Sequence, residues 1–190
     1  MWVFGMQPRL GINMPSYEPP IPAGASKANV HAFAEKVASK LGFGIGEPLE
    51  PIVARLGGRL KYRNPEGEHP ESIAVEPDGR FTIWLPTMTS ADRDRFTIAH
   101  ELGHYFLHFP LIKAKIPSAG MKATRWVSDC NPQQQRAEWE ANWFAAAFLM
   151  PAAEFRRWFA ENGNSVISTA SRFAVSTRAA EVRAASLGLR

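Results

Sequence analysis

The sequence is nearly devoid of cysteine: Cys130 is the only one among 190 residues. An intrachain disulfide is therefore excluded, as is a structural zinc site built on several cysteines, and a reducing cytoplasm is favoured. A long apolar run is also missing, because the longest one, residues 143–153, is too short to span a bilayer and contains Pro151. The first residues lack the basic and then apolar pattern of a secretory signal. We therefore expect a soluble, cytoplasmic protein with no membrane partner.

An excess of charge of one sign is lacking as well. Lys and Arg number 22 against 18 Asp and Glu, which gives a net charge of +4 with no polybasic tract. Such a balance permits contact with DNA but does not require it. What the chain does contain is 45% hydrophobic residues, enough to form the core of one compact domain with a small appendage.

Composition divides the chain into three parts. Residues 1–26 are rich in proline, which resists helix and strand, and are interpreted as an extended N-terminal arm. Residues 27–151 are expected to form the main domain, and residues 152–190 a helical tail. An α+β fold is predicted, mostly helical, with a small sheet of about three strands. The runs that predict these strands are residues 59–63, 72–75 and 81–85.

The strongest motif lies in the helix predicted over residues 89–109, which Pro110 is expected to end. His100 and His104 are four residues apart, so their imidazoles leave one face of a helix about 40° apart and about 6 Å apart along its axis. One metal ion can therefore bind both. Glu101 points to a neighbouring angle, where its carboxylate can take a proton from a metal-bound water. The H-E-x-x-H spacing thus provides two ligands and a base.

A catalytic zinc ion usually has a third protein ligand. His108 lies about 12 Å along the axis from His100 and is interpreted as structural. The helix predicted over residues 133–149 offers two carboxylates, Glu138 and Glu140. Glu138 is favoured, because Asn142 stacks on the same face four residues later, where its amide can hold a metal-bound imidazole.

The segments after the two helices are less informative. Residues 110–132 hold several prolines and basic residues, and are expected to be a long loop bordering the site. In the tail, two short amphipathic helices over 166–173 and 177–187, with Ser176 as N-cap, resemble a helix-turn-helix. Its basic excess is small, so a cap that packs on the core or grips a protein partner is favoured over DNA binding.

The two motifs together resemble the ImmA/IrrE family of metallopeptidases, a gluzincin-like group. The likeness rests on FTIAHELGHYFLH followed by E-x-x-A-N-x-F-A-A-x-F-L-M-P, and covers roughly residues 27–190. It implies a zincin-like core in which His100, His104 and Glu138 bind the metal and Glu101 is the base. It also implies a protein substrate, a helix-turn-helix repressor of stress-response or mobile-element circuits.

The expected function is therefore zinc-dependent peptide hydrolysis, with manganese as the alternative metal, since a His2Glu site accepts either. Two other classes remain open. The protein could bind a repressor without cutting it, as an antitoxin-like partner or a sensor. Alternatively, it could regulate transcription by binding DNA through residues 165–190. Replacing Glu101 with Gln would separate the enzyme from the binding protein.

Overall fold

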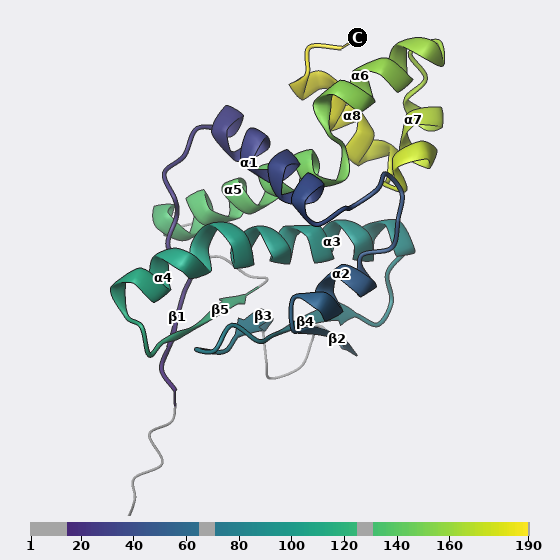
Figure 1. Ribbon diagram of the computed structural model, residues 1–190. Helices are drawn as coiled ribbons and strands as arrows, with labels where there is room; N and C mark the ends of the chain where they lie inside the picture. Colours follow the sequence, from purple (N-terminus) through teal and green to yellow (C-terminus); the bar gives the residue numbers. More distant parts are fainter. Residues whose placement is uncertain (1–14, 65–70, 125–130, 190) are drawn as a thin grey trace, which may run out of the picture.

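The computed structural model describes residues 15–64, 71–124 and 131–189. Most of the expected arm, residues 1–14, lies outside them, as do residues 125–130 with Cys130. The described chain is mostly helical around one mixed sheet, which confirms the α+β expectation. Figure 1 shows the sheet covered on one face by α3 and α4, with α1 and α5 on the far side of α3.

Within the residues that the structure describes, the sheet has five strands, two more than expected. They are β1 (Tyr17–Glu18), β2 (Gly58–Arg63), β3 (Glu71–Val75), β4 (Phe81–Pro86) and β5 (Gly120–Thr124). Their order is β1-β5-β3-β4-β2. The central β3 is antiparallel to both β4 and β5, whereas the outer strands β1 and β2 run parallel to β5 and β4. The predicted hairpin over residues 72–85 is thus the middle of the sheet.

The two unforeseen strands lie in segments that we expected to contain none. β5 falls in the proline-rich stretch 110–132, and β1 in the arm. β1 has only two residues, and β5 shows one short alternation, with Met121 and Ala123 buried and Lys122 and Thr124 half-buried, so both strands depend on their partners. At the start of β5, a Cβ on Gly120 would lie 2.4 Å from the carbonyl oxygen of Val75, so this close pairing requires glycine. Long-range pairing therefore overrides the local composition here.

The motif helix is longer than predicted. It comprises α3 (Ala91–Gly103), a π-helical turn η1 (His104–His108) and α4 (Phe109–Lys115), so the expectation that Pro110 ends it was wrong. The π turn shifts the hydrogen-bond pattern, and the Phe109 N–H bonds to the carbonyl of His104. Pro110 then occupies the first turn of α4, where its missing N–H is not required. A π turn inside a helix is frequently found at a functional site.

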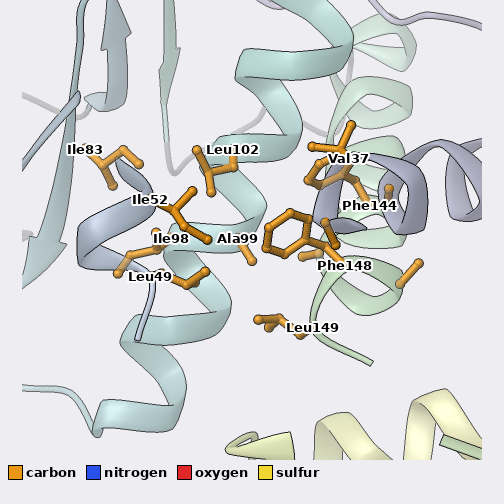
Figure 2. Close-up of a cluster of buried hydrophobic side chains, with 14 of the residues drawn as sticks. Val37, Leu49, Ile52, Ile83, Ile98, Ala99, Leu102, Phe144, Phe148 and Leu149 are labelled. Carbon is orange, nitrogen blue, oxygen red and sulfur yellow. The ribbon is translucent and has the colours of Figure 1, made fainter. Parts of the chain in front are cut away.

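The remaining helices of the main domain complete the core. They are α1 (Lys27–Lys40), α2 (Glu50–Arg55) and α5 (Pro132–Leu149). Figure 2 shows Leu102 and Ile98 of α3 facing Ile83 and Ile52 on one side, and the Phe148 ring of α5 on the other. These side chains are nearly or fully buried. The helix that carries the histidines is therefore fixed from both sides by apolar contacts.

Three helices form the tail: α6 (Ala152–Glu161), α7 (Val166–Phe173) and α8 (Thr177–Ser186). The turn between α7 and α8 contains Ala174 in the left-handed conformation, at φ 49°. Arg183 of α8 is 1% exposed and attaches the tail to the core through the Met150 carbonyl, at 2.9 Å, and the Glu35 carboxylate, at 3.3 Å. The tail is helical as expected, and its likeness to a helix-turn-helix stays a prediction. None of the helices in the described ranges has both the length and the apolarity needed to cross a bilayer.

Candidate metal centre

The site forms where α3 and α5 come close together. Gly103, between the two histidines of the motif, faces Ala141 of α5, and a Cβ on Gly103 would lie 3.0 Å from the Cα of Ala141. A larger residue would push the helices apart. The glycine of the motif therefore brings the helix with His100 and His104 close to the helix with Glu138.

Three side chains from the two helices converge on one point. The Nε2 atoms of His100 and His104 are 3.1 Å apart. The two carboxylate oxygens of Glu138 lie 3.1 Å from Nε2 of His100 and 3.2 Å from Nε2 of His104. One ligand atom from each residue lies within 4.8 Å of the others. These are the residues that the sequence proposed as ligands.

The spacing fits a single small cation. In a tetrahedral site with bonds of about 2.0–2.2 Å, ligand atoms are separated by about 3.3–3.6 Å. The distances among His100, His104 and Glu138, 3.1 to 3.2 Å, are close to this value. Two nitrogens and one carboxylate are a donor set that zinc and manganese both accept. The residues present therefore fit a divalent metal ion.

Hydrogen bonds to the Nδ1 atoms of His100 and His104 orient the Nε2 lone pairs of both rings toward the metal position. Nδ1 of His100 is 3.0 Å from Oδ1 of Asn142, which can only accept, so Nδ1 carries the proton and Nε2 the lone pair. Asn142 lies one turn beyond Glu138 on α5, so one helix face supplies both groups. This is the contact that the Glu138 and Asn142 spacing led us to expect.

His104 is oriented by a longer chain of buried groups. The Glu140 carboxylate accepts from Nε2 of His108, at 3.2 Å. Nδ1 of His108 then has the lone pair, and it accepts from Nδ1 of His104, at 2.9 Å. The Nε2 lone pair of His104 is therefore left for the metal. Arg136 and the backbone N–H of Ala23 donate to the same Glu140 carboxylate and keep it in place.

This chain of contacts also explains why Glu140 is not among the converging groups. Its carboxylate is 0% exposed and faces His108, on the side of His104 away from Glu138. Sequence reasoning treated His108 as structural and Glu140 as the weaker candidate ligand, and did not connect them. The spacing of His108 four residues after His104 was the available signal. The contact with Glu140 joins two helices that are distant in the sequence, so the spacing within one helix could not indicate it.

The ionisation of the cluster suits cation binding. Burial by itself raises the pKa of the Glu138 carboxyl, but its contacts with His100 and His104 outweigh burial and hold the pKa well below its usual range. Burial lowers the pKa of His104 to about 4, so this ring is neutral at pH 7. Burial also lowers the pKa of His100, but Glu138 and Glu101 reverse the effect and raise it overall. A cation that binds here therefore competes with a proton on His100.

The converging groups open into a cleft of about 570 Å³. Its walls include Ser72 at the start of β3, Thr124 at the end of β5, and Thr97 of α3. Glu101 is 3% exposed and lines the same cleft beside His100 and Glu138. A buried carboxylate next to a cation site that opens to solvent has the arrangement of a general base acting on water.

The comparisons with known proteins agree with this arrangement. The sequence profile of the IrrE N-terminal-like domain matches residues 60–185, a range that includes every residue proposed as ligand or base. No curated protein matches the chain. Among solved structures, a Mycobacterium tuberculosis transcriptional regulator is similar with a TM-score of 0.57 and 18% identity, over 80% of this chain and 45% of that one. The chain thus spans less than half of that regulator, and the likeness extends to the fold alone.

Proposed function

The chain belongs to the IrrE N-terminal-like, ImmA/IrrE-type metallopeptidase family, and on this basis we propose that it is a zinc-dependent endopeptidase that cleaves a helix-turn-helix repressor. The observation that carries the proposal is the convergence of three side chains in an open cleft. Nε2 of His100, Nε2 of His104 and the Glu138 carboxylate lie 3.1 to 3.2 Å from one another. Two helices and a buried network hold them there. The packing of a hydrophobic core does not require such a cluster of ionisable side chains.

Each residue has a separate role in the proposed hydrolysis. A zinc ion bound by His100, His104 and Glu138 would lower the pKa of a bound water towards 7 and polarise the scissile carbonyl. Glu101 takes the proton of the attacking water and delivers it to the nitrogen of the leaving amine. Asn142 and His108 fix the ring orientations of the two histidines. Water enters from the cleft, whereas the back of the cluster is closed by buried groups.

The choice of substrate rests on the family rather than on the geometry. The ImmA/IrrE likeness implies a repressor as the target. The structural neighbour is itself named a transcriptional regulator, although the 18% identity limits that likeness to the fold. A cleft of about 570 Å³ that is open to solvent suits an extended peptide segment of a protein. A partly unfolded or flexible segment of the repressor is therefore the expected cleavage region.

DNA binding through the tail receives less support. Arg183, one of the basic residues of α8, is 1% exposed and pairs with Glu35. Arg178, at the start of α8, pairs with Glu181 at 3.2 Å. Arg183 is buried, and Arg178 is paired although its side chain is 81% exposed, so α8 offers few free basic groups to reach phosphates, as a recognition helix must. The face of α8 that carries Arg183 serves attachment to the core.

The test is incubation of the metal-loaded chain with helix-turn-helix repressors, beginning with any that is encoded next to this protein. We expect one new fragment pair by mass spectrometry with the wild type. Glu101→Gln should keep the metal, measured by elemental analysis, and lose at least about 100-fold in cleavage rate, because the amide cannot accept a proton. Glu161→Gln, at an exposed position of α6, is the matched control and should cleave normally.

Three outcomes would contradict the proposed peptidase activity or its mechanism. If Glu101→Gln cleaves at the wild-type rate, Glu101 is not the base. If the metal-loaded wild type binds the repressor but leaves it intact, the protein is a non-cleaving partner. If the tail shifts promoter DNA in a salt-dependent manner while the repressor stays intact, the protein is a DNA-binding regulator.

A further inference from the structure

A second cavity, of about 860 Å³, adjoins the cleft of the metal centre. Its walls come from the N-terminal half of α3, from α5 and from α8 of the tail, and we call it the tail groove. Four residues line both the cleft and the tail groove: Arg93, Phe96, Thr97 and Asn142. A peptide that crosses the metal centre on this side therefore enters the tail groove directly. Figure 1 shows α8 among the tail helices, beyond the end of α5.

Large apolar side chains line the tail groove. Trp139 is 54% exposed and Val182 is 52% exposed, which is unusual for residues of this size and polarity. Phe96 lies one helical turn before His100, and Trp143 one turn after Trp139. Clustered apolar side chains in a cavity beside a reactive site are the usual lining of a ligand pocket. The apolar part of the groove thus begins one turn from the proposed metal ligands.

The charged side chains of the tail groove are mainly basic. Lys27, Arg93 and Arg178 are exposed along its walls, against Asp92. Arg183 also contributes to the wall, but it is buried and paired with Glu35. Arg178 pairs with Glu181 at 3.2 Å, but Glu181 does not line the groove, so the exposed charges that line it are positive on balance. An apolar lining with a basic edge is complementary to a segment that carries an apolar side chain next to a carboxylate.

We propose that the tail groove binds the substrate segment adjacent to the scissile bond, and that it selects an aromatic or aliphatic residue next to an acidic one. The proposal rests on the proposed endopeptidase function, since it assumes that a peptide lies across the metal centre. It also gives the tail a defined role, because α8 forms one wall of the substrate site. Val182 and Arg178 are then specificity-determining residues, although they lie on a different part of the chain from the metal ligands.

Binding of defined peptides tests the groove separately from cleavage. The probes are three dye-labelled peptides of ten residues that differ only in the two central positions, which are Phe-Glu, Phe-Lys or Ser-Glu. The protein is the full chain, metal-loaded and carrying Glu101→Gln, so that bound peptide stays intact. Fluorescence anisotropy should show the Phe-Glu peptide binding at least about ten-fold more tightly than either of the other two. Equal affinities for the three peptides would overturn the proposal.

Substitutions on α8 then locate the binding. Val182→Asp and Arg178→Glu should each weaken binding of the Phe-Glu peptide about ten-fold, and Arg178→Glu should also reduce its advantage over Phe-Lys. The matched controls are Ile167→Asp on α7, at a position that is 73% exposed, and Arg157→Glu on α6. Neither control residue lines the tail groove, so neither variant should change binding. The side chain of Arg178 is 81% exposed, so its substitution leaves the fold intact even if Val182→Asp does not.

The two proposals fail in different ways. The first case is that the Phe-Glu peptide binds in an Arg178-dependent manner but the wild type never cleaves peptide or repressor. The proposed endopeptidase activity is then wrong, and the proposal that the tail groove binds peptides is supported. The second case is that the wild type cleaves the repressor and that Val182→Asp and Arg178→Glu cleave it at the same rate. The proposed role of the tail groove is then wrong, and the proposed endopeptidase activity is supported. The proposed role of the tail groove is also overturned if the α8 variants bind the Phe-Glu peptide with the same affinity as the control variants.

Discussion

The two histidines of the centre differ in what lies behind them. His104 has a side chain with no exposure, and it is backed by His108 and Glu140, which are equally inaccessible. His100 is 15% exposed in its side chain and is backed by Asn142, whose side chain lies at the surface of the cleft. We call these the closed side and the open side. The closed side fixes the geometry through buried charge, and the open side leaves room for water and a peptide.

The largest expected effect comes from removing Glu138, which contacts both sides. Glu138→Ala leaves two histidines, too few for a stable catalytic zinc site, so the purified variant should lose its stoichiometric metal. A metal at about 100 times its dissociation constant stabilises a protein by about 2.7 kcal/mol, and this gain should vanish in the variant. Elemental analysis and thermal melts with and without added zinc measure both effects. Retention of one tightly bound ion in Glu138→Ala would show that Glu138 is not a ligand.

The next prediction compares the two sides directly. Glu140→Gln removes the buried charge that orients His108 and, through it, His104, so metal affinity should fall by about 10- to 100-fold. Asn142→Ala should cost less than about ten-fold, because water can replace an exposed amide as the acceptor of the His100 proton. Competition with a zinc chelator at fixed pH measures both affinities. A larger loss for Asn142→Ala would reverse the assignment of closed and open sides.

A smaller effect is expected where the two helices meet. Gly103→Ala places a methyl group 3.0 Å from the Cα and 3.1 Å from the carbonyl oxygen of Ala141, both backbone atoms that cannot turn aside. Overpacking of this kind costs about 1–3 kcal/mol, partly offset by the better helix propensity of alanine, about 1 kcal/mol. The melting temperature of the metal-free protein should therefore fall by a few degrees. An unchanged or higher value would mean that α5 is free to shift at this point.

The converging side chains and Glu101 were easier to predict from sequence than the groups that lie behind His104. His100, His104 and Glu101 follow from helical spacing within a few residues, and Glu138 with Asn142 from spacing within the next helix. Each of these relations is local, so a single periodic pattern contains it. The structure brings these side chains together, and their roles as ligands and base stay proposals.

The closed side was not predicted because it depends on contacts between separate helices. With α-helical spacing, His108 was expected to lie about 12 Å along the axis from His100, too far to share one metal ion, and Pro110 was expected to end the helix. Instead, His108 pairs with Glu140 of α5, and the π turn over residues 104–108 lets the helix continue as α4 from Phe109. β5 was missed for a related reason: its residues gain strand geometry from pairing with β3 and β1. Contacts between distant segments decide both features.

The last prediction concerns the effect of acid on the wall of the tail groove. His31 lines the tail groove, and its Nδ1 accepts from Arg183 at 3.2 Å. Burial, with help from Arg183 and Lys27, lowers the pKa of His31 from 6.5 to about 4. Between pH 6.5 and about 4 the unfolded chain therefore binds more protons at His31 than the folded chain does. As the pH falls through this range, the free energy of unfolding decreases by an amount on the order of 1 kcal/mol. Glu140 keeps its charge in this range, since burial raises its pKa but His108, Ala23 and Arg136 lower it to about 2.

Hydrogen exchange at pH 7 and pH 5, corrected for the intrinsic rates, measures the contribution of His31. The amides of α8, which Arg183 attaches to the core, should lose protection at pH 5 in the wild type. His31→Asn is the matched variant, because the Asn oxygen can still accept from Arg183 but does not titrate, and it should reduce the loss of protection in α8. Equal loss of protection in α8 of the wild type and of His31→Asn would mean that another group, such as His104, whose pKa burial also lowers to about 4, sets the response to acid.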